Sequence, residues 1–155
     1  MGEYCVIDVP ELATIKIKSG QKLLVNGPPK EQSEATRNLI QEMMAFEDSY
    51  IQKAKNDPRD EAVVIFDRGV MDNLAYMGQP ALDYFRQHKY LDLDTIRDSR
   101  YDMVIHMKSA ADGAPEFYTL ANNTARSESV DRAKELDREI LKSWTGHRNH
   151  KYSLY

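Results

Sequence analysis

Two short apolar runs, Ala62 to Phe66 and Met103 to Met107, constrain the fold of this chain most strongly. Nearly every position in them is apolar, which is typical of strands buried on both faces. Long segments of helical character lie around them, and a parallel crossover connection needs a dozen or more residues. Together with a third β-prone run, Tyr4 to Val9, the pattern predicts an α/β fold in which a parallel sheet is flanked by helices.

Two helices are clear from the spacing of apolar residues. Between residues 32 and 56, apolar side chains recur every three or four positions, and Pro58 lies just beyond. A second helix is predicted over residues 131–144, with Ser129 as its N-cap and Gly146 after its end. Shorter helices are predicted around residues 71–76, 81–90 and 116–122.

Composition limits the classes of function. The chain has 155 residues, the length of one domain, and its net charge of -4 gives no electrostatic reason to expect a nucleic-acid partner. Cys5 is the only cysteine, so an internal disulfide is excluded and a reducing, cytoplasmic location is expected. No apolar run is long enough to span a bilayer, so no transmembrane segment is predicted.

Asp67 and Arg68 directly follow the apolar run at 62–66. Open α/β sheets bind ligands in the crevice beyond the carboxyl ends of their strands. If phosphates occupied that crevice, Asp67 could hold Mg²⁺ directly or through water, or accept a proton from an attacking hydroxyl, while Arg68 could neutralise charge on an acceptor. The alternative is structural: Asp67 caps the following turn and Arg68 is a surface cation.

A second group of polar residues follows the third strand. Asn122 and Asn123 offer amide side chains, and Arg126 and Arg132 flank a short connector before the last helix. Arginines on a mobile lid can stabilise charge on a transferred phosphoryl group. Arginines near a helix start are more often simply solvated, and although Tyr118 could stack on a base, an aromatic residue beside another aromatic is more often used for packing.

A phosphate-binding loop is missing from these 155 residues. Its pattern is Gly, four residues, Gly, Lys, then Ser or Thr, and none of the seven glycines is followed by Lys. The stretch "LLVNGPPKEQSEAT" imitates the loop faintly, but Pro28 and Pro29 remove backbone donors that would cradle phosphate. We interpret it as an ordinary connecting loop.

Several blocks of the sequence resemble a known family. The stretch "FDRGVMDNLAYM" at 66–77 resembles the Asp-Arg strand of P-loop nucleoside and nucleotide kinases. Together with "PELAT" at 10–14, "MAFEDSY" at 44–50 and "DMVIHMKSAADGAPEFYTLANNTARSES" at 102–129, it is similar to the NAD-regulator type of AAA/P-loop ATPase domain found in the TRPL translocation defect proteins.

The resemblance implies a P-loop kinase-like domain over residues 1–147 that is incomplete, lacking its first strand, phosphate loop and last strand. Residues 148–155 would be a divergent, loosely ordered tail. The implied ligand is GTP or ATP with Mg²⁺ at Asp67. Catalytic roles are implied for Asp67, Arg68, Arg126 and Arg132, and substrate-binding roles for Glu11, Asp72, Tyr118, Asn122 and Asn123.

Three hypotheses about function stay open. The first is a truncated regulatory nucleotide-binding module with impaired binding. The resemblance links this module to trafficking proteins, phosphoinositides and the membrane periphery. The second is part of a phosphotransferase acting on a nucleoside-like or other small hydroxyl substrate. The third is a fragment or splice product without independent activity.

Overall fold

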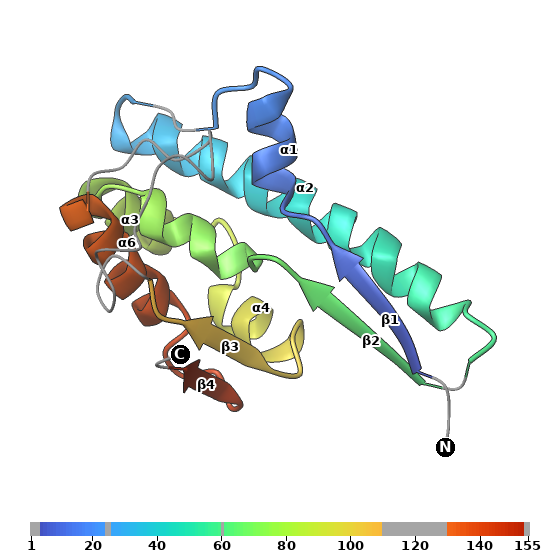
Figure 1. The fold of residues 1–155 in the computed structure, drawn as a ribbon. Helices are drawn as coiled ribbons and strands as arrows, with labels where there is room; N and C mark the ends of the chain where they lie inside the picture. Colours follow the sequence, from blue (N-terminus) through green and yellow to red (C-terminus); the bar gives the residue numbers. More distant parts are fainter. Residues whose placement is uncertain (1–3, 24–25, 60, 110–129, 154–155) are drawn as a thin grey trace.

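The structure, a computed structural model, describes residues 4–23, 26–59, 61–109 and 130–153. It is an α/β arrangement of small parallel sheets and helices (Figure 1). The elements follow one another as β1 (Tyr4–Val9), α1 (Leu12–Lys18), α2 (Pro29–Lys55), β2 (Glu61–Phe66), the 3-10 helix η1 (Val70–Tyr76), α3 (Gln79–Gln87), α4 (Leu93–Ser99), β3 (Val104–Met107), α6 (Val130–Ser143) and β4 (His150–Ser153).

The four strands of the described residues form two separate two-stranded sheets. β1 pairs with β2 in parallel, with Val6 opposite Val63. β3 pairs with β4, also in parallel, with Ile105 opposite Lys151. The prediction of parallel strands is therefore confirmed, although the described strands do not join into a single sheet. β4 lies in the segment where no regular structure was predicted.

Helix α2 covers the first sheet. It begins with Pro29, whose fixed φ and missing N–H suit the first helical position. Ile40 and Met43 on its inner side are buried, and the helix runs along β1 and β2 (Figure 1). The hydroxyl of Ser33 donates to the carbonyl of Ala81 at 2.8 Å, which ties α2 to α3. The predicted helix over residues 32–56 is thus confirmed, three residues longer at its start.

The core lies around η1, which is almost fully buried. Helix α6 packs against η1, and Trp144 just beyond α6 is buried beside it. The predicted helices at 71–76, 81–90 and 131–144 correspond to η1, α3 and α6, whereas α1 and α4 were not predicted. Ser129 and the helix expected at 116–122 lie outside the described residues. The buried cluster comprises Ile40, Met43, Val70, Met71, Leu74, Ala75, Phe85, Tyr101, Leu136, Ile140 and Trp144.

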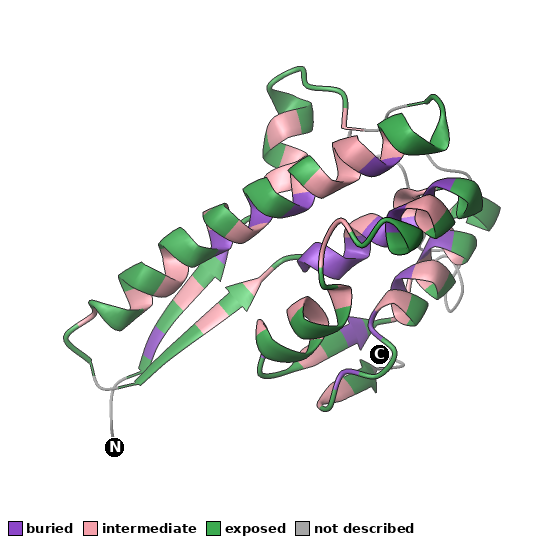
Figure 2. Cartoon of the chain, turned by 180° about the vertical axis from the view of Figure 1, so that it is seen from behind, coloured by how far each residue is buried: buried purple, intermediate pink, exposed green. Residues whose placement is uncertain are grey.

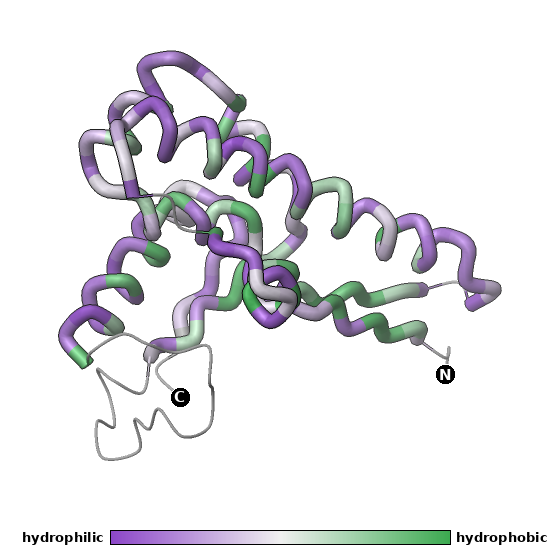
Figure 3. The backbone as a smooth tube through the Cα atoms, turned by 90° about the horizontal axis from the view of Figure 1, so that it is seen from above, coloured by the Kyte–Doolittle hydropathy of each residue, from purple (hydrophilic) through white to green (hydrophobic). Residues whose placement is uncertain are grey.

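Several apolar side chains of the strands are exposed, as Figure 2 shows for both sheets. Val63 and Ile65 of β2 are 46% and 50% exposed, and Ile105 and Met107 of β3 are 61% and 77% exposed. The tube in Figure 3 shows how hydrophobic β1 and β2 are along their length. The prediction that β2 and β3 are buried on both faces is therefore wrong. The reason is that, among the described elements, each strand is paired along one edge and only one face is packed.

Candidate functional site at the strand ends

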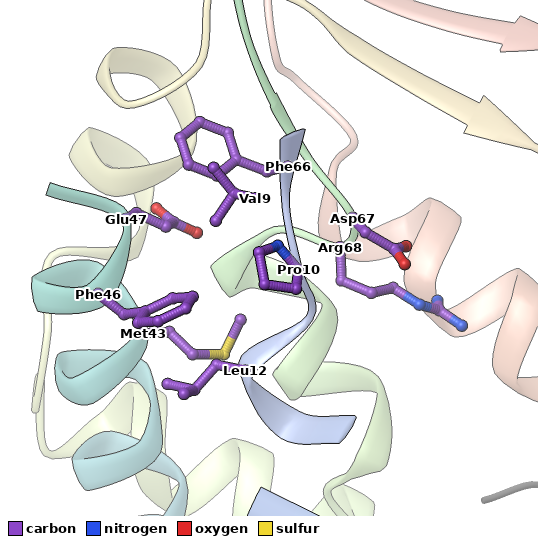
Figure 4. Close-up of a pocket in the computed structure, with 9 residues that line it drawn as sticks. All are labelled: Val9, Pro10, Leu12, Met43, Phe46, Glu47, Phe66, Asp67 and Arg68. Carbon is purple, nitrogen blue, oxygen red and sulfur yellow. The ribbon is translucent and has the colours of Figure 1, made fainter. Parts of the chain in front are cut away.

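Asp67 stands at the carboxyl end of β2, beside the end of β1. Its backbone N–H donates to the carbonyl of Val9 at 3.2 Å, so the parallel pairing continues one step past the strands. Glu11 follows β1 by two residues and precedes α1. Because parallel strands end at the same edge of a sheet, the pairing brings Glu11 close to the Asp67–Arg68 turn. Figure 4 shows the Asp67 and Arg68 side chains directed away from Met43 and Phe46.

Arg68 connects the acidic residues of this edge. Its backbone has a φ of 73°, in the left-handed region that non-glycine residues seldom adopt. The Nε atom is 4.0 Å from Glu11 Oε1, and Nη1 is 3.7 Å from Asp72 Oδ2. Burial by itself would lower the pKa of Arg68. The negative charges of the nearby carboxylates, Asp72 first among them, have the larger combined effect, so the pKa of Arg68 is raised. The guanidinium therefore stays charged and is held between two acidic side chains.

Asp72, on η1, is buried and fully engaged. Its Oδ1 accepts a hydrogen bond from Trp144 Nε1 at 2.5 Å. Burial raises the pKa of Asp72, although the Trp144 hydrogen bond and the charge of Arg68 oppose that rise. Gly69 permits this contact, because a Cβ atom there would lie only 2.5 Å from the Trp144 ring. Trp144 ends the helix predicted over residues 131–144, and nothing in the sequence indicates that it contacts Asp72.

We call Glu11, Asp67, Arg68 and Asp72 the strand-end cluster. It combines three carboxyl groups with one guanidinium, so negative charge exceeds positive charge when the carboxyls are ionised. Mg²⁺ is usually held by one or two carboxylates together with waters and substrate phosphates. Among the described residues there is no group of three or more potential metal ligands. Within the cluster, Asp67 is the carboxylate that could hold a Mg²⁺ arriving with a phosphate ligand.

Two cavities adjoin the cluster. One, lined by Val9, Met43 and Phe46 behind Asp67, has a volume of about 10 Å³, the space of a single water molecule (Figure 4). The other is a wide cleft of about 2320 Å³ that all four residues of the cluster line. A ligand of the strand-end cluster would therefore approach from the wide cleft.

The other predicted site residues are placed as follows. Arg132 lies near the start of α6, exposed, with Nη1 at 2.5 Å from Glu135 Oε2, and it lines the same wide cleft as Asp67. The structure therefore brings Glu11, Asp67, Arg68 and Asp72 together and sets Arg132 on the wall of their cleft. The catalytic and binding roles of all these residues stay predictions. Tyr118, Asn122, Asn123 and Arg126 lie outside the described residues.

Comparison with known proteins places the chain in a family. A family model described as an AAA domain matches residues 3–154, which is nearly the whole chain. No curated protein and no solved structure matches this sequence. Among the described helices, none is both long and apolar enough to cross a membrane.

Proposed function

Because the chain belongs to the AAA domain family, whose fold is of the P-loop nucleotide-binding type, we propose that its strand-end cluster binds GTP or ATP together with Mg²⁺. The observation that carries the proposal is the position of Asp67. It stands at the carboxyl end of a parallel strand and opens into the wide cleft. Ligands of open α/β sheets bind at this edge.

Each residue of the strand-end cluster has its own proposed role. Asp67 would hold Mg²⁺ directly or through water, and the bound Mg²⁺ would neutralise charge on the phosphates. Arg68 is kept charged by its carboxylate partners and is available to a phosphate oxygen or an acceptor group. Asp72, anchored by Trp144, fixes the direction of the guanidinium.

We propose that the chain acts as a regulatory nucleotide-binding module with weak affinity. Within the 155 residues no Gly-Lys pair occurs, so the backbone cradle and the lysine of a phosphate loop are absent from the sequence. Those groups contribute much of the attraction for the β- and γ-phosphates. A trafficking role and phosphoinositide binding are supported by the family resemblance of the sequence alone. Arg132, which is exposed near the start of α6 and lines the same cleft, is proposed to contact the phosphates.

Nucleotide binding is tested by titrating the chain with fluorescent GTP and ATP analogues, with Mg²⁺ and with EDTA. We expect binding that requires Mg²⁺ and is lost in Asp67→Asn, because the amide keeps the shape of the side chain and removes its charge. Asp83→Asn is the matched control. Asp83 lies on α3, where it accepts a hydrogen bond from the side chain of Gln79, and it does not line the cleft.

Three results would contradict the proposal: no binding by the unaltered chain, binding that EDTA leaves intact, or equal binding by Asp67→Asn. Transfer of phosphate to a nucleoside or another small hydroxyl compound would favour the phosphotransferase over the regulatory module.

A further inference from the structure

Strand β4 is held to the rest of the molecule by a small set of contacts. Among the described strands it pairs with β3 alone, over the four residues from His150 to Ser153. Asn149 extends this pairing, because its carbonyl accepts a hydrogen bond from the N–H of Val104 at 3.0 Å and its side chain donates to the carbonyl of Asp102 at 3.0 Å. Short peripheral elements open at a lower free energy than the core of a fold. β4 can therefore detach while the rest of the chain stays folded.

His147, in the turn before β4, supports Asn149 only while its ring is neutral. Its Nε2 lies 2.8 Å from the carbonyl oxygen of Tyr101, so this nitrogen carries a hydrogen and donates it. Its Nδ1 accepts a hydrogen bond from the N–H of Asn149 at 3.2 Å. Asp98 next to α4 is the acidic group whose charge interacts with this ring. A second proton would occupy Nδ1, so the Asn149 N–H would lose its acceptor.

Two further histidines face each other across β3 and β4. The ring centroids of His106 and His150 are 6.2 Å apart, and His106 also stacks on Tyr152 of β4 at 5.4 Å. The Nε2 atoms of both histidines are buried, and neither has a hydrogen-bond partner in the described structure. Burial and the neighbouring His106 and His147 lower the pKa of His150. The contact between the two strands therefore depends on a neutral His150 ring.

The acidic groups near these histidines lie beside His106. Oδ1 of Asp137 on α6 is 3.3 Å from His106 Nε2, and Asp72 of η1 also interacts with the charge of His106. The groups whose charge acts on His150 are the two other histidines. A proton on His106 can thus be balanced by a carboxylate, whereas a proton on His150 faces further positive charge.

We infer that His106, His147 and His150, here called the histidine cluster, hold β4 on β3 at neutral pH and release it below about pH 6. Charge on His147 removes the acceptor of the Asn149 N–H, and charge on His150 places a cation without a counter-charge between the strands. The turn after α6 stays in place, because a charged His147 keeps its Nε2 hydrogen bond. The inference concerns the C-terminal strand and does not depend on nucleotide binding at the strand-end cluster.

Hydrogen exchange of single amides, followed by nuclear magnetic resonance, tests the release in the unaltered chain. Protection factors are compared between about pH 7.5 and about pH 5.5, which removes the intrinsic pH dependence of exchange. The probes are the amides of Val104 and Asn149, and the references are those of the buried Ile40 and Ile140 in α2 and α6. We expect protection of the probes to fall about tenfold further than that of the references, since pH 5.5 is about one unit below the ordinary histidine pKa.

The aromatic rings supply a second measurement on the same samples. The nuclear Overhauser effects between His106 and Tyr152 should disappear over the pH range in which His147 and His150 titrate. Titration of these histidines with the ring contact and the probe protection retained would overturn the inference. An equal loss of protection in α2 and α6 would overturn it too, because the whole chain would then be unfolding rather than β4 alone.

A double variant tests the charges themselves. His147→Gln with His150→Gln removes both titrating rings, and the glutamine amide at position 147 can still donate a hydrogen bond. We expect this variant to keep the same Val104 protection at both pH values. His88→Gln, at the exposed end of α3, is the matched control and should lose protection as the unaltered chain does. An undiminished loss in the double variant, or no loss in His88→Gln, would contradict the role of the histidine cluster.

Discussion

At the scale of single residues, Arg68 has the most constrained conformation in the site. Its φ of 73° is unfavourable for a side chain that carries a Cβ, yet its guanidinium lies between Glu11 and Asp72. Backbone strain of this kind costs about 1–2 kcal/mol and is often found where a site positions a side chain. The turn after β2 is therefore strained, and it positions the guanidinium of Arg68 between two carboxylates.

Comparison of Arg68→Gly with Arg68→Ala isolates this strain. Both variants lose the guanidinium, and both leave the buried Asp72 without its ion pair. Only glycine adopts the left-handed conformation without strain. We therefore expect the free energy of unfolding of Arg68→Gly to be about 1 kcal/mol higher than that of Arg68→Ala. Urea denaturation of the two variants measures the difference. Equal stability, or greater stability of the alanine variant, would show that the backbone at this position is not strained.

At the scale of elements, three histidines lie on or next to the β3–β4 sheet: His106 on β3, His150 on β4 and His147 just before β4. His150 on β4 has a lowered pKa, because burial disfavours its charge and because His106 and His147 stand near it. Its Nε2 is buried and has no hydrogen-bond partner in the described structure. The folded state therefore binds the His150 proton less readily than the unfolded chain does, so protonation opposes folding.

The lowered pKa of His150 makes its contribution to the free energy of unfolding depend on pH. A lowered pKa in the folded state stabilises the fold above the unfolded value of about 6.5, and that contribution is lost as the pH falls through the folded pKa. We expect the contribution of His150 to the free energy of unfolding to fall between pH 7.5 and pH 5, by at most about 1.4 kcal/mol per pH unit. Urea titrations of His150→Gln should show a flatter dependence. His88→Gln, at the exposed end of α3, should keep the original slope.

At the scale of the whole molecule, the two sheets are connected through side chains rather than through strand pairing. Tyr101, just before β3, donates its hydroxyl hydrogen to Glu47 Oε1 of α2 at 2.8 Å and accepts from the N–H of Val70 at 3.0 Å. Arg100 adds an ion pair to Glu47 at 3.0 Å. Burial raises the pKa of Glu47 and of the Tyr101 phenol. This buried network joins the helix that covers β1 and β2 to the segment that leads into β3.

Tyr101→Phe should weaken that connection. The substitution leaves the Val70 N–H and one oxygen of Glu47 without their partner in a buried place. An unsatisfied buried polar group costs about 1–3 kcal/mol, so we expect a loss of that size in the free energy of unfolding. Chemical denaturation monitored by circular dichroism measures it. Tyr4→Phe, at a tyrosine that is 60% exposed, should change stability very little, and a similar loss in both variants would contradict this role of Tyr101.

The sequence predicts the parts of this fold that depend on local patterns. β1, β2 and β3 were placed to within a residue, because runs of apolar and β-branched residues are typical of strands. The parallel pairing of β1 with β2 sets Asp67 beside the end of β1. The contact between Trp144 and Asp72 joins residues 72 positions apart, and no local pattern encodes it. The separation of the two sheets and the left-handed turn at Arg68 likewise depend on tertiary contacts that spacing does not reveal.

The packing of Trp144 against Gly69 and Asp72 gives the chain a built-in optical probe. It is the only tryptophan in the sequence, it is 3% exposed, and its indole N–H is bonded to a member of the strand-end cluster. Indole emission depends on nearby charge and on access to water. The intrinsic fluorescence of this protein therefore reports the electrostatic state of one small region, and it does so without any attached dye.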